Sequence, residues 1–466
     1  MKKIFVSLMG FATALLLTGC NMDVPLTHNT DGDKPMEKVQ DVTNALNGAM
    51  EEFGGYRFMG RNYVATGDFC ADISLASPET GHFSALNNWA FNERTSELQA
   101  MWDAGYVVIA ACTRGIEGAN QVMAKVSSDA EKQTLTNCLQ QFYGLKAATY
   151  FYLSNLFCKA YSSEHATGWG LILVKDEIIK PEQKVDRANL EDTYKYILEL
   201  IEKAYSYDNK ETSPFYINPI NLKAIEAKVR LYMRDYQGAY DAAEAVVTSN
   251  TYKEVNMKET DYLAMWKSVA RAPEDVFTIV KSDNDNLSAN ALNTLYGSYK
   301  GTVDLSFLKP LFAEGDYRAK LFDAKKSRTL KYEGTLTAQA VSNIHVIRLS
   351  EVYLIKAEAA AQLDKVADAQ TALLYTAKRN PAIKAVADLP STKEDLLKFI
   401  AEERVRELFT EGNRFFDLRR TEAIATVAGD ANFKAYNSVF PIPVSEINAG
   451  FMTQQNDDWK DNLPKR

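Results

Sequence analysis

Three glutamates recur at every fourth residue near the end of the chain, at Glu403, Glu407 and Glu411. On a helix this spacing places all three carboxylates on one face. Paired carboxylates can serve as the acid and base that hydrolyse a glycosidic bond. The alternative is a structural ion-pair network, because like charges at this spacing repel one another and need cations opposite them. The residues favour the network, since no histidine or nucleophile accompanies the row.

The residues beyond the glutamate row suggest how its charges are balanced. Gly412 suits the left-handed conformation with which many helices end. Arginines follow this glycine at short intervals. We therefore expect the row to pair with Arg414, Arg419 and Arg420.

Cys20 is a second residue with evident chemistry. Two lysines and an apolar run precede it, as in a secretory signal peptide. The run ends in Leu17-Thr18-Gly19-Cys20, which resembles a bacterial lipobox, where a signal peptidase cuts and the cysteine receives lipid. The run is too short to span a membrane as an uncleaved helix. We expect residues 1–19 to be a signal peptide, Cys20 to be the lipid attachment site and residues 20–35 to form a flexible tether.

Composition narrows the classes of partner. The chain has 466 residues, a net formal charge of −8 and 46% hydrophobic residues. An acidic chain without a basic patch argues against nucleic acid as a partner. It also argues against binding to anionic lipid by charge, so we expect the acyl chains on Cys20 to attach the protein to the membrane. The remaining cysteines are Cys70, Cys112, Cys138 and Cys158. They could form disulfides or lie buried as free thiols, and none has the spacing of a metal site. We expect no metal and no cofactor.

Helical periodicity dominates the body of the chain, where apolar residues recur at three- and four-residue spacing. Two segments, 224–247 and 353–377, each break near an aspartate and resemble tetratricopeptide hairpins. Their alanines let neighbouring helices approach closely. The other expected helices are residues 36–53, 95–125, 134–161 and 190–205. The predicted fold class is therefore mostly α, with helical hairpins, long loops and a few short strands, one of them at 276–280.

Two long segments interrupt the helical pattern, at residues 54–92 and 284–302. A stretch of this length without its own secondary structure is either functional or disordered. The first segment holds several aromatic residues, which argues against disorder. We expect both segments to be ordered loops.

The glutamate row belongs to a longer pattern. Residues 403–420 match the signature ER-x-x-EL-x-x-EG-x-R-x-x-DL-x-R, and residues 348–359 and 440–448 resemble two further blocks of the same family. The chain therefore resembles the SusD/RagB family, the surface nutrient-binding lipoproteins of Bacteroidota. One departure is the turn at 168–173, which lacks the acidic residue and the proline that are usual there. The resemblance covers nearly the whole chain after the leader.

The resemblance implies a SusD-like helical body made of an N-terminal region, 36–250, and a C-terminal region, 251–466. It implies a binding protein, not an enzyme. Such a protein captures a glycan and acts as the lid of a SusC-like TonB-dependent transporter, anchored by lipid in the outer membrane and exposed at the cell surface. Two alternatives remain open: a peptide as the nutrient, as in the RagB branch, and a helical glycoside hydrolase. Motifs of common nucleotide- and metal-dependent enzymes are absent from the sequence.

Binding in this family depends on aromatic faces that contact sugar C–H groups and on amides or carboxylates that contact hydroxyls. Both long loops contain these residue types. Trp89 stands beside two asparagines, so that it could stack on a ligand and have amides within reach; it could equally plug the loop against the helices. The predicted ligand-binding residues are Asp68, Asp72, Asn87 and Trp89 from the first loop and Tyr296 and Tyr299 from the second.

Overall fold

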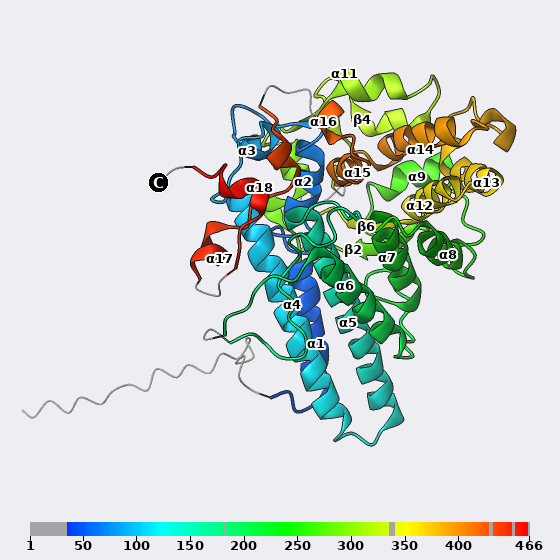
Figure 1. The fold of residues 1–466 in the computed structure, drawn as a ribbon. Helices are drawn as coiled ribbons and strands as arrows, with labels where there is room; N and C mark the ends of the chain where they lie inside the picture. Colours follow the sequence, from blue (N-terminus) through cyan, green and yellow to red (C-terminus); the bar gives the residue numbers. More distant parts are fainter. Residues whose placement is uncertain (1–34, 181–182, 335–340, 428–431, 450–452, 465–466) are drawn as a thin grey trace, which may run out of the picture.

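The computed structural model describes residues 35–180, 183–334, 341–427, 432–449 and 453–464. The predicted signal peptide, Cys20 and all but the last residue of the predicted tether lie outside these ranges. The fold is mostly α with a few short strands, as the sequence predicts (Figure 1). No helix in the described parts of the chain combines the length and apolar character that crossing a bilayer requires.

Long packed helices make up one end of the molecule (Figure 1). They are α1 (Val39–Phe53), α4 (Ser96–Met123), α5 (Asp129–Phe157) and α6 (Leu190–Tyr205), with α1, α4 and α6 each packed against α5. Side chains before two of these helices cap them: Ser128 accepts from the backbone N–H of Glu131, and Asn189 from that of Asp192. Such caps satisfy N–H groups that the first helical turn leaves free. All four helices were predicted, with ends that differ by a few residues.

Glycine allows α4 and α5 to lie close together. A Cβ atom placed on Gly115 of α4 would lie 2.2 Å from the ring of Phe142 on α5. Gly105 meets Leu153 in the same way, at 2.7 Å. The contact between these helices therefore depends on the absence of side chains at two points.

Two helical hairpins follow, as predicted. The first consists of α7 (Pro219–Tyr232) and α8 (Tyr236–Val247), and the second of α12 (Leu349–Gln362) and α13 (Val366–Ala377). The hairpins stack through α8 and α12, and both helices have buried alanines whose small side chains allow close contact. The predicted breaks are confirmed, since Asp235 caps α8 by accepting from Gly238 N–H and Asp364 adopts a φ of +60°.

Shorter helices complete the C-terminal region. The longest is α14 (Lys393–Leu408), which starts at the side-chain cap of Thr392 and packs against α12 and α13. The others in the described residues are α9 (Glu259–Met265), α10 (Leu292–Tyr296), α11 (Leu305–Leu308), α15 (Arg414–Arg420), α16 (Ile424–Val427), α17 (Val444–Asn448) and α18 (Asp457–Lys460).

The strands form three antiparallel pairs in the described ranges. The predicted strand at 276–280 is β2 (Asp275–Ile279), and it pairs with β6 (Ile344–Arg348) with Thr278 opposite His345. β4 (Phe322–Asp323) pairs with β5 (Arg328–Thr329). β1 (Ser74–Leu75) pairs with β3 (Thr302–Val303), and this pair joins the two long loops.

The first long loop contains helices that periodicity did not reveal. These are α2 (Asn62–Phe69) and α3 (Ser84–Asn87). Every residue of α2 is buried, so the helix has no polar face and shows no amphipathic period. The expectation of an uninterrupted loop at 54–92 is wrong for this reason.

The interior joins the predicted N- and C-terminal regions. One hydrophobic cluster runs from Val42 on α1 to Trp459 on α18. The four cysteines of the body are free and buried, so the buried-thiol alternative holds and the disulfide alternative does not. Burial raises the pKa of all four thiols, to about 12 for Cys112 and about 11 for Cys138 and Cys158.

Candidate functional site

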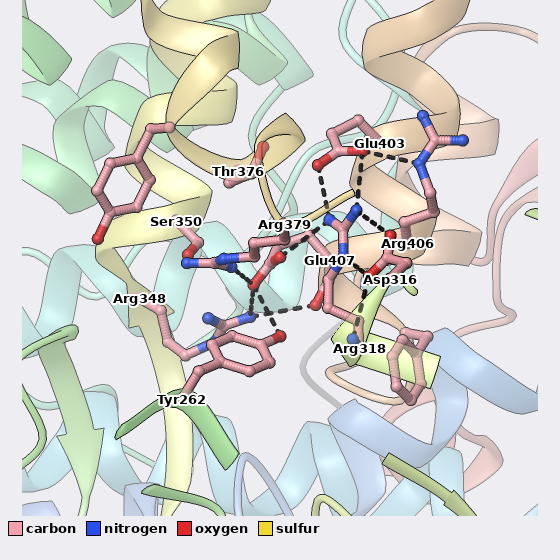
Figure 2. A network of polar contacts seen from close by, with 12 residues as sticks. Tyr262, Asp316, Arg318, Arg348, Ser350, Thr376, Arg379, Glu403, Arg406 and Glu407 are labelled. Carbon is pink, nitrogen blue, oxygen red and sulfur yellow. Dashed lines mark hydrogen bonds and ion pairs between the residues drawn. The ribbon is translucent and has the colours of Figure 1, made fainter. Parts of the chain in front are cut away.

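The glutamate row lies inside the protein. Figure 2 shows Glu403 and Glu407 within a network of ion pairs. The carboxylate of Glu407 on α14 accepts from Arg348 at 3.0 Å and from Arg318 at 3.3 Å. Arg379 forms a third ion pair with it, and the Tyr262 hydroxyl donates to it at 3.0 Å. Glu407 is fully buried, so its partners and not water satisfy its charge.

The two flanking glutamates belong to the same network. Glu403 accepts from Arg318 at 2.6 Å and from Arg406 at 2.7 Å. Glu411 accepts from Lys331 and from Arg348, both at 2.7 Å. Because α14 ends at Leu408, Glu411 lies beyond the helix and the three carboxylates do not share one helical face.

The predicted partners of the row are wrong. Arg414 pairs with Asp72 at 2.6 Å, and Arg420 pairs with Glu358 at 2.5 Å and with Asp417 at 2.9 Å. Arg419 donates to the carbonyl of Ser438 at 3.3 Å. The chain reverses after α14, where Thr410 and Gly412 adopt positive φ values, so α15 directs its arginines elsewhere. Most of the cations that do pair with the row come from distant segments, which local spacing cannot reveal.

The geometry rules out the glutamate row as a hydrolytic acid and base. Burial alone would raise the pKa of Glu403, Glu407 and Glu411, but the facing arginines more than offset it and hold each pKa below the ordinary glutamate value. A general acid must hold a proton near neutral pH and reach its substrate. These carboxylates are ionised and buried, so they form the structural network that the residues favoured.

The two long loops meet at α10 and β1. Ser74 and Tyr296 share a hydrogen bond of 2.9 Å between their hydroxyls, and the Tyr296 hydroxyl also donates to Asp68 at 3.3 Å. The Tyr296 ring stacks on Phe69 with centroids 5.7 Å apart. The structure therefore brings together first- and second-loop residues that the sequence proposed for one site.

Several of the predicted ligand-binding residues hold the loops together. Asp68 is fully buried and also accepts from the backbone N–H of Gly412 at 3.0 Å. Asp72 forms a two-point ion pair with Arg414. The side chain of Asn87 accepts from Ala76 N–H and donates to the carbonyls of Phe69 and Ser74. A ligand would have to displace these partners to use the side chains.

Trp89 also faces the interior. Its side chain is 7% exposed, and its ring centroid lies 4.9 Å from that of Phe433 and 6.2 Å from that of Phe415. The tryptophan therefore closes the loop against the C-terminal helices, which is the structural alternative given above. Its predicted contact with a ligand stays a prediction.

Tyr299 differs from these residues, because it is only half buried. Its ring stacks on His82 of the first loop, with centroids 3.9 Å apart and planes 18° apart. Beside this pair, the guanidinium of Arg61 lies 4.9 Å from the ring of Tyr56 and donates to Asn290 at 2.8 Å. We call the surface formed by Tyr56, Arg61, His82, Asn290 and Tyr299 the loop face.

A cavity of about 460 Å³ opens beside Tyr299. Its lining is mainly polar. Oδ1 of Asn293 is buried without a hydrogen-bond partner among the described residues, and Nε of Arg328 forms an ion pair with the Asp323 carboxylate at 3.6 Å. Amide, guanidinium and hydroxyl groups such as those in the lining can form hydrogen bonds with the hydroxyls of a ligand. The lining residues are Ser288, Ala289, Asn293, Thr294, Tyr296, Gly297, Ser298, Arg328, Thr329, Tyr332 and Glu333.

Sequence reasoning missed His82, Asn293 and Arg328. Asn293 lies in the asparagine-rich loop, so composition could have suggested it. Nothing in the sequence marks Arg328, which reaches the cavity only because β5 lies next to β3. No group of side chains in the described ranges could hold a metal ion.

Both loops contain strained backbone. Four of the nine described non-glycine residues with positive φ lie in them: Phe83, Trp89, Ser288 and Lys300, with φ values between +47° and +59°. Such conformations are unfavourable for residues other than glycine and persist only where surrounding contacts enforce them. Strain of this kind is common at binding sites, and here it borders the loop face and the cavity.

Comparisons with known proteins agree with the resemblance noted in the sequence. Residues 250–461 match the model of the SusD family. The SusD-like protein P38 of Formosa agariphila is 22% identical over 433 residues, which cover 78% of this chain and 81% of that protein. A SusD superfamily protein from Bacteroides vulgatus has a crystal structure that is 25% identical, with a TM-score of 0.80 over 92% of this chain and 100% of that one.

Another solved structure, a laminarin binding SusD-like protein, is 20% identical. Its TM-score is 0.72, and the match covers 90% of this chain and 99% of that one. The family match in the C-terminal half, the relative that spans both halves and the shared helical fold all support the SusD/RagB family for this chain.

Proposed function

We propose that this chain captures a glycan at the loop face and the neighbouring cavity, and passes it to a SusC-like TonB-dependent transporter on which it acts as a lid. The observation that carries the proposal is the convergence of the two loops. They meet around the half-buried Tyr299–His82 stack, next to a cavity whose lining is mainly polar. Aromatic faces beside hydrogen-bonding groups suit sugar rings.

The similar proteins support a glycan as the ligand class. One of the solved structures with this fold binds laminarin, a polysaccharide. The glutamate row gives an argument against hydrolysis at that position. Its carboxylates are ionised and buried, so they cannot act as an acid and base pair on a glycan. We therefore favour binding over turnover, and purified protein should leave a bound glycan intact.

The location is part of the proposal. The leader and Cys20 predict a lipid-anchored protein, and the resemblance to the SusD/RagB family supports an outer-membrane location at the cell surface. Replacing Cys20 by serine should abolish labelling by a radioactive fatty acid and release the protein from outer-membrane fractions. Labelling and retention in the Cys20→Ser variant would contradict the anchor.

The ligand class can be tested by titrating the mature chain, from residue 21 on, with a panel of polysaccharides and a panel of peptides in a calorimeter. Tyr299→Ala should weaken glycan binding about tenfold, as expected for the loss of one stacking contact. Tyr216→Ala is the matched control, because Tyr216 is another exposed tyrosine outside the loop face. Binding of peptides alone would favour the RagB-like alternative, and equal affinity in the Tyr299 and Tyr216 variants would place the site elsewhere.

A further inference from the structure

Lys146 differs from the other buried lysines of the described chain. Four lysines there are less than 5% exposed. Three of them pair with carboxylates: Lys228 with Glu351 at 2.9 Å, Lys281 with Asp285 at 3.1 Å and Lys331 with Glu411 at 2.7 Å. Lys146 forms no ion pair with any described residue, although burying an unpaired charge is costly.

The contacts of Lys146 leave its ammonium group incompletely satisfied. Its Nζ atom donates to the carbonyl of Lys175 at 2.7 Å and lies 5.9 Å from the ring centroid of Tyr196. An ammonium group has three N–H donors, and this carbonyl is its acceptor among the described residues. The group therefore retains donors for a ligand.

Lys146 lines a groove of about 490 Å³ between α4, α5 and α6. The volume lies within the usual range for small-molecule sites. None of its lining residues belongs to the loop face or to the cavity beside Tyr299, so the groove is a separate feature. A buried and unpaired cation in a groove of this size marks a site for an anionic group.

The rest of the groove indicates what carries that anion. Tyr143 and Tyr196 contribute ring surface, and the rim holds three carboxylates, two amides and two further lysines. The carboxylates balance the three lysines of the groove, so the lining suits a ligand with one negative charge better than a ligand with several, and they can accept hydrogen bonds from hydroxyls. We propose that this groove binds a sugar acid, a hexuronate unit whose carboxylate accepts from Lys146 while its hydroxyls donate to the rim. The rim residues are Glu117, Asn120, Gln121, Lys175, Asp176, Glu199 and Lys203.

The test compares D-glucuronate and D-galacturonate with D-glucose, by ligand-observed NMR on the mature chain at pH 6.5. The wild type should bind at least one of the two acids and bind it more tightly than glucose, and Lys146→Met should weaken that binding about tenfold or more. Methionine has a similar length and no charge, so the variant should fold with unchanged helical circular dichroism. Lys195→Met is the matched control, because Lys195 is an exposed lysine on α6 that pairs with Glu191 and does not line the groove.

A second measurement tests whether acid binding is coupled to protonation of Lys146. Burial lowers the pKa of Lys146 to about 8, and a bound carboxylate favours the charged ammonium. Binding should therefore weaken as pH rises above about 8 and take up a proton there, which calorimetry in two buffers detects. The titratable and charged groups around Lys146 come from each neighbouring element. They are Cys112 and Glu117 from α4, Tyr143 from its own helix, Lys175 and Asp176 from the segment after α5, and Tyr196, Glu199 and Lys203 from α6. Burial raises the pKa of Cys112 and that of Tyr143 to about 12.

Three results would overturn the site: no binding of either acid to the wild type, glucose binding as tight as that of the acids, or undiminished acid affinity in Lys146→Met. The test is independent of the loop face, since Tyr299→Ala should leave acid binding at the groove unchanged. Loss of acid binding in Tyr299→Ala with full binding in Lys146→Met would move the acid to the loop face.

Discussion

Arg348 is a single side chain that serves three carboxylates. It donates to Glu407 at 3.0 Å (Figure 2), and to Glu274 and Glu411, both at 2.7 Å. The arginine is 1% exposed. Each of these acids is buried and needs a cation nearby. The arginine at the end of β6 therefore connects that strand to the end of α14.

Arg348→Met should destabilise the protein by about 3–5 kcal/mol, because it leaves buried carboxylates without a main partner. Urea unfolding followed by circular dichroism measures the change. Lys398→Met is the control: its side chain is 78% exposed and its ion pair with Asp395 spans 3.8 Å, so the expected change is below about 0.5 kcal/mol. A similar loss of stability in both variants would mean that the buried network contributes no more to stability than an exposed ion pair does.

Asp68 is a buried acid whose pKa is shifted in the opposite direction to the pKa values of the three glutamates in the row. Burial raises its pKa well above the ordinary value, against the hydrogen bonds from Gly412 and Tyr296 that lower it. Between the unfolded and folded pKa values the folded state holds a proton that the unfolded state has lost, so this residue makes stability fall as pH rises.

Asp68→Asn should therefore stabilise the protein relative to wild type above neutral pH and have a smaller effect near pH 5. Thermal melting at several pH values measures this difference. The amide introduced by this substitution can still accept from Gly412 and can donate to the Tyr296 hydroxyl. Glycan binding should persist in the variant; its loss without loss of stability would return Asp68 to the ligand site.

At the scale of elements, the packing of the long helices depends on glycines at the points where the helices come close together. Gly115 lies where α4 crosses α5, and its missing Cβ leaves room for Phe142. Gly48 on α1 is exposed and has no atom within 4 Å of the corresponding position. The two glycines share a conformation but not a packing role.

Substituting alanine at these two sites should have opposite effects. Gly115→Ala should destabilise by about 1–3 kcal/mol, because the added methyl overlaps a packed ring. Gly48→Ala should stabilise by about 0.5–1 kcal/mol, because alanine loses less backbone entropy in a helix. The melting temperatures of the two variants relative to wild type measure both effects, and a gain at Gly115 would refute the close contact.

The whole molecule is held by charge as well as by its core, which makes its stability sensitive to acid. Arginines lower the pKa of Asp417 to about 2 and also lower that of Glu403, Glu407 and Glu411. A carboxyl with a depressed folded pKa contributes stability above its unfolded pKa, and this contribution is lost as pH falls through the folded value.

Stability should accordingly change little, on account of these groups, between pH 7 and about 5, and then fall between about pH 4.5 and 2. Urea midpoints measured across this range test the prediction. Asp417→Asn should be less stable than wild type at pH 7 and should lose less stability on acidification. An unchanged slope in this variant would show that other groups control acid unfolding.

Much of the architecture was predictable, because it depends on local pattern. Apolar periodicity identified the long helices, and the alanine-rich hairpins were found with their breaks near Asp235 and Asp364. The short helix α2 was missed because it is buried on all sides and has no period to detect. The ligand-binding residues stay a prediction; the structure shows that several of them, such as Asp68 and Tyr296, form contacts where the two loops meet.

The sequence by itself indicated the family and determined the helical class and the identity of the charged row, since spacing along one chain carries that information. Only the tertiary structure decided which cations pair with the row, which loop residues remain accessible and which buried lysine lacks a carboxylate partner among the described residues. Arg318, Arg348 and Arg379 lie from 28 to 89 residues before the glutamates of the row that they contact. Pairing and burial are set by contacts between distant segments, and one sequence records the segments without their contacts.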